Sequence, residues 1–348
     1  MIRNGFIKNS GRLKARKTSI VVMLLALSTL FFIGCGHNER NENLPEKVII
    51  GTQTLADPEG IAKAEGWLEA QMGIPVEIVK FDGGRDVNMA MASGEIDFGL
   101  LGSVPAALAI SNDVDCKVIY IQSVLGDIES LMVNPKLGIK NAGDLKGKTV
   151  ATVFSSTSHY SLLKYLECNN VSAEDVDIID MNASSIVAAY QRGDIDAAFI
   201  WDPQVTELEK LGALRLTSAK ELSNYGYATM DVEIVSTKFA ENYPFLVQKY
   251  ISLMDQAVRL YKSDPDEAGL SLSKDLGIDK KTCINQIESS LWLTCDEQKG
   301  TQWFGSDSLA NTLYETAVFL YEQGDVLEEP KLESFREKVD SEFINGVE

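Results

Sequence analysis

Two copies of one short motif restrict the fold more than any other feature of the sequence. Residues 93–99 read Ser-Gly-Glu-Ile-Asp-Phe-Gly, and residues 192–198 read Arg-Gly-Asp-Ile-Asp-Ala-Ala. In each copy a helix is expected to end at the glycine, and a strand of small residues follows the Ile-Asp turn. Each strand then leads to a helix started by a proline, Pro105 or Pro203. The repeat predicts two lobes with the same local architecture, although Gly-Asp-Ile-Asp also suits a helix-to-strand link that recurs by chance.

Short apolar strands alternate with amphipathic helices up to residue 236, a pattern typical of right-handed βαβ units. Strands are expected at 48–52, 76–81, 96–101, 117–122, 149–153, 176–180 and 232–236, with one more ending at Trp201. Amphipathic helices are expected afterwards at 245–261, 279–291, 308–322 and 332–343. We therefore predict an α/β protein with two lobes, each a mainly parallel sheet flanked by helices, and additional C-terminal helices. Lobe 1 is expected to contain residues 47–130 and 233–348, and lobe 2 residues 131–232.

The N-terminus has the pattern of an export signal. Six basic residues precede a 14-residue apolar run at 20–33, which is short for a membrane span. The run ends in Phe32-Ile33-Gly34-Cys35, which resembles the lipobox of bacterial lipoproteins. We expect residues 1–34 to be removed, Cys35 to be acylated, and residues 35–46 to form a polar tether. An extracytoplasmic, lipid-anchored protein follows, whereas the alternative is an ordinary secretory signal with an incidental cysteine.

Charge and cysteine content exclude several classes of partner. The net charge of −19 argues against nucleic acid and against a basic membrane-binding face. Cys116 and Cys168 lie in apolar contexts and are expected to be buried thiols, while Cys283 and Cys295 suit either a disulfide or two free thiols. The cysteines lack zinc-site spacing and the chain has two histidines, so we expect no metal and no cofactor.

The stretch at 153–163 predicts an anion site. A buried strand runs into a turn rich in hydroxyl groups, and a helix with Leu162 and Leu163 on one face follows. Ser156 or Thr157 is a natural N-cap, because its side-chain oxygen accepts a free amide hydrogen of the first turn. Free N–H groups at the positive end of a helix dipole favour an oxyanion.

Other loops at the carboxyl ends of the strands are expected to meet this turn in a cleft between the lobes. Their hydroxyl, amide, acidic and aromatic side chains suit a small molecule with an oxyanion at one end and an ammonium at the other. The candidate ligand-binding residues are Gln53, Asp57, Ser103, Thr157, Ser158, His159, Tyr160, Trp201, Asp202 and Asp231.

Several candidates also have an ordinary structural role. Asp57 suits the N-cap of the helix that starts at Pro58, and Asp202 suits the cap of a helix after Pro203. Trp201 ends a buried strand, and His159 shares the packed face of its helix. Asp231 is the sharpest candidate, because a lone acid at a strand start needs a partner, and we expect that partner to be an amine.

Several blocks of the sequence are similar to the nitrate/sulfonate/taurine group of solute-binding proteins of bacterial ABC importers. These blocks are 81–84, 101–105, 154–163, 188–196 and 229–232. The resemblance implies a periplasmic-binding-protein type II fold, a monomer, and a permease as partner. It further implies that Ser103, Thr157 and Ser158 lie at the sulfonate end, and that Asp231 meets the amine. Gln53 and Asp57 match the first-lobe loop, whereas Tyr225-Gly226, Ala228 and Glu233 depart from the group's pattern.

Taurine or a related small aminosulfonate is therefore the expected ligand. The first alternative is the same fold with another ligand, namely an alkanesulfonate, nitrate or a pyrimidine precursor of thiamine. The second alternative is an enzyme of the pyrimidine-synthase type. That chemistry needs clustered His or Cys side chains, and the candidate site offers His159 alone, so we expect a binding protein and no enzyme.

Overall fold

The computed structural model of the protein describes residues 44–347. The predicted leader, Cys35 and most of the predicted tether lie outside this range. None of the helices between residues 44 and 347 combines the length and apolar character needed to cross a bilayer.

All of the predicted strands are present, in the predicted order. The strands are β1 (Val48–Thr52), β2 (Val76–Lys80), β3 (Phe98–Gly102), β4 (Cys116–Leu125), β5 (Glu129–Val133), β6 (Thr149–Thr152), β7 (Asp177–Asp180), β8 (Ala197–Trp201), β9 (Leu214–Ser218), β10 (Met230–Ser236) and β11 (Ser290–Leu291). The helices are α2 (Pro58–Ala64), α3 (Trp67–Met72), α4 (Gly84–Ser93), α5 (Ser103–Ser111), α6 (Thr157–Cys168), α7 (Ala183–Arg192), α8 (Gln204–Lys210), α9 (Ala219–Ser223), α10 (Thr237–Asn242), α11 (Pro244–Ser263), α12 (Pro265–Leu276), α13 (Lys280–Glu288), α14 (Cys295–Gln298), α15 (Ser308–Gln323), α16 (Leu332–Lys338) and α17 (Glu342–Asn345).

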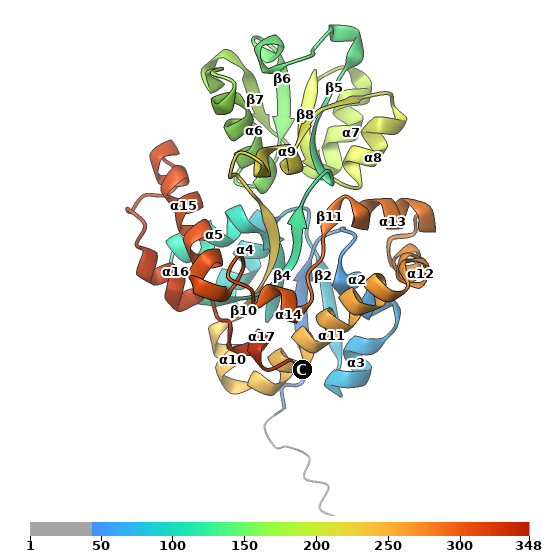
Figure 1. Cartoon of the computed structure of the whole chain (residues 1–348), viewed down its shortest axis with the longest axis vertical. Helices are drawn as coiled ribbons and strands as arrows, with labels where there is room; N and C mark the ends of the chain where they lie inside the picture. The colour runs from blue at the N-terminus through green and yellow to red at the C-terminus, as the bar shows by residue number, and fades with distance from the viewer. Residues whose placement is uncertain (1–43, 348) are drawn as a thin grey trace, which may run out of the picture. The chain divides into compact units, whose positions relative to one another are not determined.

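Two sheets with helices on their faces form the two lobes (Figure 1). The sheet of lobe 1 has six strands in the order β11-β4-β10-β3-β1-β2, and the sheet of lobe 2 has five in the order β7-β6-β8-β5-β9. The predicted parallel pairing is confirmed for β1 with β2 and β3, and for β6 with β7 and β8. Each sheet is nevertheless mixed, because β10 runs antiparallel to β3 and β4, and β5 antiparallel to β8 and β9.

The two antiparallel strands are those at which the chain changes sheet. β5 is the first strand of lobe 2 after β4, and β10 is the strand that returns to lobe 1 after β9. The short connections before β5 and before β10 therefore join the lobes. The predicted lobe limits at residues 130/131 and 232/233 fall within two or three residues of these strand starts and remain predictions.

The repeated motif has the same geometry in both lobes. Gly94 and Gly193 end α4 and α7 in the left-handed conformation, with φ of 75° and 79°. Asp97 then accepts a hydrogen bond of 2.8 Å from the backbone N–H of Ile49 in β1, and Asp196 accepts one of 3.0 Å from Thr149 in β6. In each copy, therefore, the glycine allows the left-handed turn that ends the helix. The aspartate before the next strand forms a hydrogen bond to the backbone of the neighbouring strand.

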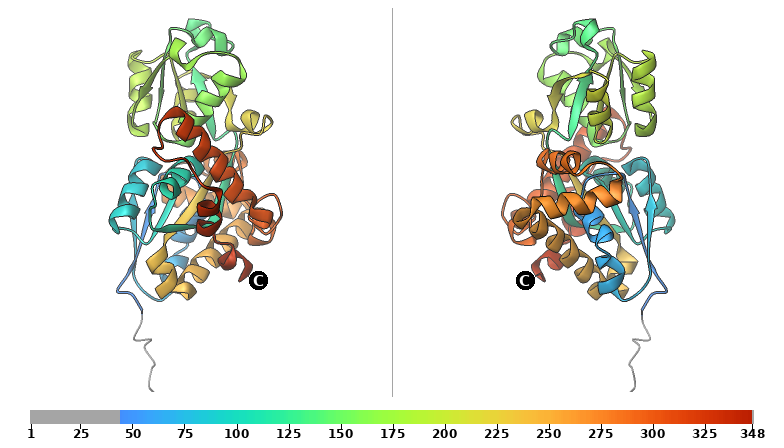
Figure 2. Two further views of the ribbon diagram at one scale, coloured as in Figure 1. Left: turned by 90° about the vertical axis from the view of Figure 1, so that its left-hand side faces the viewer. Right: turned by 90° about the vertical axis from the view of Figure 1, so that its right-hand side faces the viewer.

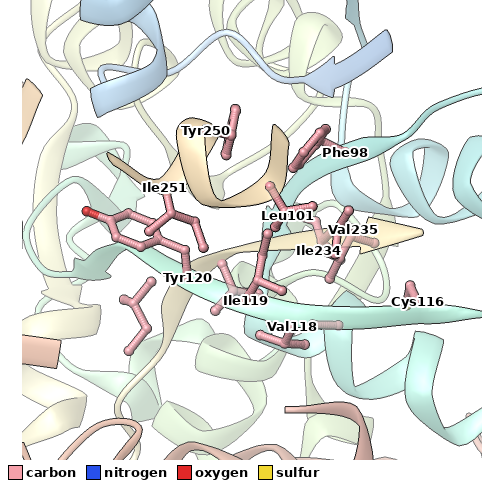
Figure 3. Packing of buried hydrophobic residues seen from close by; sticks show 14 of the residues in the cluster. Phe98, Leu101, Cys116, Val118, Ile119, Tyr120, Ile234, Val235, Tyr250 and Ile251 are labelled. Atoms are coloured by element: carbon pink, nitrogen blue, oxygen red, sulfur yellow. The ribbon is translucent and has the colours of Figure 1, made fainter. Parts of the chain in front are cut away.

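The core of lobe 1 lies between its sheet and the C-terminal helices. Phe98 of β3 and Tyr250 of α11 stack with ring centroids 4.5 Å apart, and side chains of β4 and β10 complete the cluster (Figure 3). Both side views place the helices drawn in orange and red beside the six-stranded sheet, with α15 reaching the elements of lobe 2 (Figure 2). The C-terminal helices therefore pack on the sheet of lobe 1.

Several details of the prediction differ from the structure. The sequence analysis missed the strands β5, β9 and β11 and the helix α12. The helix expected at 332–343 is divided into α16 and α17 because residues 339–341 are not helical. Cys168 is exposed, because the last turn of α6 faces solvent, so its predicted burial was wrong. Of the two alternatives for Cys283 and Cys295, a disulfide or two free thiols, the structure has two free thiols. Cys116 is buried as predicted.

Candidate functional site

A cavity of about 30 Å³ lies where strand ends and helix starts of both lobes meet. Its lining comes from residues that the linear sequence separates widely. The lining residues are Gln53, Leu55, Gly84, Gly102, Pro105, Leu125, Ile128, Glu129, Ser156, Thr157, Trp201 and Asp231. Ligands of open α/β sheets bind at such carboxyl ends of strands, so this cavity is the candidate ligand site.

Three helices begin at the cavity. The lining includes Gly84 at the start of α4, Gly102 directly before α5, and Thr157 at the start of α6. The residues that precede α4 and α5 are glycines, so no capping side chain accepts from the first-turn N–H groups of these two helices. Ser156 is the N-cap of α6, as the sequence predicts, and its Oγ accepts a hydrogen bond of 3.2 Å from the N–H of His159. Converging helix N-termini give this wall of the cavity a positive potential that favours an oxyanion.

Glycine permits two close contacts at this wall, one between the lobes at residue 102 and one between α4 and α5 of lobe 1 at residue 84. A Cβ atom added to Gly102 would lie 2.7 Å from Cγ2 of Thr157, and one added to Gly84 would lie 2.7 Å from Cγ of Pro105. Real Cβ atoms do not approach other carbons this closely. The start of α6 therefore contacts β3 only because residue 102 has no side chain.

Glu129 is the central acidic group of the cavity, and its carboxylate accepts three hydroxyl hydrogen bonds. The donors are Oγ1 of Thr157 at 2.5 Å, Oγ of Ser158 at 2.9 Å and Oγ of Ser161 at 3.3 Å. Burial raises the pKa of Glu129 to about 7, although these hydrogen bonds act in the opposite direction. We expected the hydroxyls of residues 157 and 158 to face an external anion, and they instead donate to this carboxylate.

Asp231 supplies a second acidic group at the start of β10. Its backbone lies opposite Gly102 of β3, and its carboxylate accepts a hydrogen bond of 3.3 Å from Oγ of Ser123. Desolvation raises the pKa of Asp231 to about 7. Within residues 44–347, no lysine or arginine pairs with Asp231 or with Glu129. Two carboxyl groups thus share one cavity with no cation of the described chain to neutralise them.

Three further candidates lie in or directly beside the cavity. Trp201 ends β8 and lines the cavity, as does Gln53, whose Nε2 donates a hydrogen bond of 3.1 Å to the carbonyl oxygen of Leu100. Ser103 is buried next to the lining, and its Oγ accepts a hydrogen bond of 3.3 Å from the backbone N–H of Met230. Ser103 therefore helps to hold the start of the strand that carries Asp231.

Asp57 and Asp202, for which the sequence also suggested a capping role, do not line the cavity. Asp57 is the N-cap of α2 and accepts a hydrogen bond of 2.7 Å from the N–H of Gly60. Asp202 accepts hydrogen bonds from the backbone N–H and the hydroxyl of Thr206, at 2.9 and 2.6 Å. Burial raises the pKa of both carboxyls. The structure therefore gives each of them the structural role that the sequence analysis weighed as its alternative.

The two ring-bearing candidates of α6 point away from the cavity. His159 stacks on Phe154 with ring centroids 4.5 Å apart, and burial lowers its pKa. Tyr160 packs edge-to-face on Phe319 of α15 at 5.2 Å. Successive residues of a helix point in different directions, so the start of α6 turns Thr157 to the cavity and Tyr160 to the neighbouring helix.

Sequence reasoning missed Glu129. The signal was available, because Glu129 is a lone acid at the start of an apolar strand that continues through Leu131, Met132 and Val133. The same pattern selected Asp231. Glu129 was not among the predicted site residues, because it lies next to the predicted boundary between the lobes at residues 130/131, where no strand was expected. In the part of the chain that the structure describes, no group of three or more His, Cys, Asp or Glu side chains could hold a metal ion.

The two-lobed α/β fold, the cavity between its lobes and the 34% identity to a periplasmic binding protein together place the chain among the extracytoplasmic solute-binding proteins. The chain belongs to the NMT1/THI5-like family, whose model matches residues 58–268.

Its relatives are binding proteins with similar length and fold. The taurine-binding periplasmic protein of Escherichia coli K12 is 34% identical over 285 residues, which are 80% of this chain and 87% of the relative. A putative aliphatic sulfonates-binding protein of Bacillus subtilis 168 is 27% identical and covers 77% of this chain and 82% of the relative. The alkanesulfonate-binding protein SsuA of Xanthomonas axonopodis pv. citri, solved with MOPS bound, has the same fold with a TM-score of 0.71 at 23% identity, covering 85% of this chain and 99% of that one.

The fold alone does not separate binding proteins from enzymes. The desulfurization enzyme DSZB shares it with a TM-score of 0.63 at 16% identity, covering 86% of this chain and 98% of that one. The cavity lining described above contains neither cysteine nor histidine.

Proposed function

We propose that the protein binds taurine or a related small aminosulfonate in the cavity between its lobes and delivers it to the permease of an ABC importer. One observation carries this proposal. Glu129 and Asp231, neither paired with a lysine or arginine of the described chain, line the same cavity as three helix N-termini. A ligand that satisfies both features carries a positive and a negative group a few bonds apart.

The anionic end of the ligand is assigned to the wall formed by α4, α5 and α6. The first turns of α4 and α5, which have no side-chain cap, favour a sulfonate, because the three oxygens of that group accept several hydrogen bonds at once. Gln53 adds an amide with a second hydrogen free, because its Nε2 makes a single bond to Leu100. The hydroxyls of α6 are engaged with Glu129, so backbone groups bear most of this role.

The cationic end is assigned to Glu129 and Asp231. A desolvated ammonium needs carboxylates to offset its lost hydration, and a bound cation in turn favours the ionised form of the two carboxyls. The ring of Trp201 lines the same space and provides an aromatic face for a cation or an alkyl chain. Support also comes from the names of the relatives, which include a taurine-binding protein and sulfonate-binding proteins.

An alkanesulfonate, nitrate or a pyrimidine would leave two carboxyls without a positive partner. A protein of the same fold could bind such ligands, but Glu129 and Asp231 disfavour them here, because these ligands have no positive group to pair with the two carboxyls. We further propose that the exported chain is a monomer anchored to the membrane through acylated Cys35, on the strength of the lipobox-like sequence.

Isothermal titration calorimetry with a matched pair of ligands tests the proposal. Taurine and ethanesulfonate share the two-carbon chain and the sulfonate, and only taurine has the amine. We expect one taurine per chain and affinity for ethanesulfonate at least about thirtyfold weaker, since one lost buried ion pair is worth about 2 kcal/mol or more. Absence of binding for taurine and for every short sulfonate at millimolar concentration contradicts the proposal.

A further inference from the structure

Lys164 is the one basic side chain of the described residues that is buried, with 8% of its surface exposed. It lies on α6, two turns after Thr157 and one turn after Ser161, which both donate to Glu129. Its ammonium forms an ion pair of 2.9 Å with Glu167, one turn further along the helix. Buried lysines are rare and cost free energy unless other groups compensate for the lost hydration. The compensation here comes from Glu167 and from aromatic rings of α6 and of two other segments.

Three aromatic rings surround this ammonium. The Nζ atom lies 3.8 Å from the ring centroid of Phe319, 5.0 Å from that of Tyr227 and 5.8 Å from that of Tyr160. All three distances fall within the range of cation–π attraction, which is strongest for a desolvated cation. We use the name Lys164 cage for the lysine and these three rings.

The Lys164 cage connects both lobes. Lys164 and Tyr160 belong to α6 of lobe 2, and Tyr227 belongs to the connection that leads into β10. Phe319 belongs to α15, which packs on α5 and α16 of lobe 1 and reaches lobe 2 in the left view of Figure 2. A small apolar cluster around Val104, Tyr160 and Phe319 continues the contact. The cage therefore ties the C-terminal helix α15 to the helix whose first turn lines the ligand cavity.

We propose that the Lys164 cage is a latch between the lobes, which positions α6 and thereby sets the affinity of the ligand site from outside it. One rigid helix links the two places, because seven residues of an α-helix separate Thr157 from Lys164 by about 10 Å. When the cage is intact, the first turn of α6 stays against β3 and the cavity needs little rearrangement to bind. When the cage is lost, ligand binding has to supply the free energy that brings α6 back.

Variants of two members of the cage separate charge from packing. Lys164→Met keeps the unbranched stem and removes the ammonium, Lys164→Arg keeps a cation, and Phe319→Leu keeps an apolar side chain and removes the ring face. Lys210→Met is the matched control, because Lys210 also forms an ion pair with a glutamate three residues away on a lobe 2 helix, and it is exposed. The intact chain is used throughout.

Two readouts are needed, and the first requires no ligand. Hydrogen exchange of the ligand-free protein is expected to rise in α6 and α15 for Lys164→Met and Phe319→Leu, and to stay at the wild-type level for Lys164→Arg and Lys210→Met. Small-angle scattering is expected to show a larger radius of gyration for the first two variants. Unchanged exchange and unchanged radius in Lys164→Met overturn the latch.

Taurine affinity is the second readout and rests on the proposed function. We expect Lys164→Met to weaken taurine binding about tenfold and to leave one binding site per chain. The loss of binding free energy in the Lys164→Met/Phe319→Leu double variant should be smaller than the sum of the two single losses, because both substitutions remove the same contact. Equal losses for Lys164→Met and Lys164→Arg, or fully additive losses in the double variant, overturn the proposal. If the wild-type protein fails to bind taurine, the proposed function falls, and hydrogen exchange and scattering still decide the latch.

Discussion

Thr157 donates a hydrogen bond of 2.5 Å to Glu129, so the first residue of α6 holds a carboxylate of the neighbouring strand β5. Ser158 and Ser161 donate to the same carboxylate. The hydroxyl-rich turn therefore orients an acid of the protein, and the helix N-termini around it remain for an anion. Positive and negative recognition groups lie within one cavity, which is why a zwitterion fits it better than a simple anion.

Glu129→Gln is expected to weaken taurine binding while leaving ethanesulfonate nearly unaffected. Glutamine keeps the shape and an acceptor oxygen for the hydroxyls of α6, and it removes the charge that an ammonium needs. Loss of one member of a buried charge pair costs about 2 kcal/mol or more, or about thirtyfold in Kd. Calorimetric titration of both ligands checks the prediction, and a parallel loss for ethanesulfonate contradicts it.

Asp231→Asn is likewise expected to weaken taurine binding and to leave ethanesulfonate binding nearly unaffected. Ser123→Ala is the matched control. The hydrogen bond from Ser123 lowers the pKa of Asp231 against the larger effect of burial. Its removal should therefore raise that pKa further and shift the pH dependence of taurine binding upward without abolishing it. Titrations of the three proteins at several pH values measure this. Asp231 has no role at the amine if Asp231→Asn weakens taurine and ethanesulfonate equally.

Taurine binding is expected to strengthen as the pH rises through about 7. Burial raises the pKa of both Glu129 and Asp231 to about 7, so below that pH the cavity holds neutral acids that cannot pair with an ammonium. Binding near pH 6 should therefore release protons, and the affinity should change by up to about tenfold per pH unit for each proton released. Titrations in buffers with different ionisation enthalpies count these protons; ethanesulfonate should release none.

The same two groups have the opposite effect on the stability of the ligand-free protein. Their folded-state pKa values lie above the unfolded-state values, so the folded form binds more protons between about pH 4 and 7. Their contribution to the free energy of unfolding is complete below the unfolded-state pKa and is lost as the pH rises through about 7. In urea denaturation, the free energy of unfolding of Glu129→Gln should fall less steeply with pH across this range than that of the wild-type protein. An unchanged pH dependence of the free energy of unfolding contradicts the raised pKa of Glu129.

The sequence predicted the parts of the fold that depend on local patterns. Glycine at a helix end, an Ile-Asp turn and a small-residue strand are local features, and both copies of the motif have the predicted geometry. The candidate site was predicted less completely, because Gln53, Thr157, Trp201 and Asp231 line the cavity while Tyr160 points to α15. The direction of a side chain near a helix start depends on which neighbouring helix packs there, and α15 lies about 160 residues further along the chain.

Gly102→Ala is expected to reduce ligand affinity with little change in stability. The backbone at residue 102 has φ of −66°, which alanine adopts freely, so the cost arises only from contact of the new Cβ with Cγ2 of Thr157 at 2.7 Å. This contact pushes α6 away from β3, and we expect taurine binding to weaken about tenfold. The double variant Gly102→Ala/Thr157→Ser should recover most of the affinity, because serine keeps the hydroxyl for Glu129 and lacks the clashing methyl.

Gly94→Ala is the control for the Gly102 variants. At residue 94 there is space for a side chain and the backbone conformation disfavours one, whereas at residue 102 the backbone conformation allows a side chain and space is lacking. An added Cβ at Gly94 meets nothing within 4 Å, and its φ of 75° is a left-handed conformation that costs alanine about 1 kcal/mol. We therefore expect Gly94→Ala to lower the free energy of unfolding by about that amount and to leave taurine affinity unchanged. Calorimetric titration and urea denaturation of the four proteins separate the two requirements. If Thr157→Ser fails to rescue Gly102→Ala, contact between the lobes at this point does not control binding, and the anion wall has to be assigned to α4 and α5 alone.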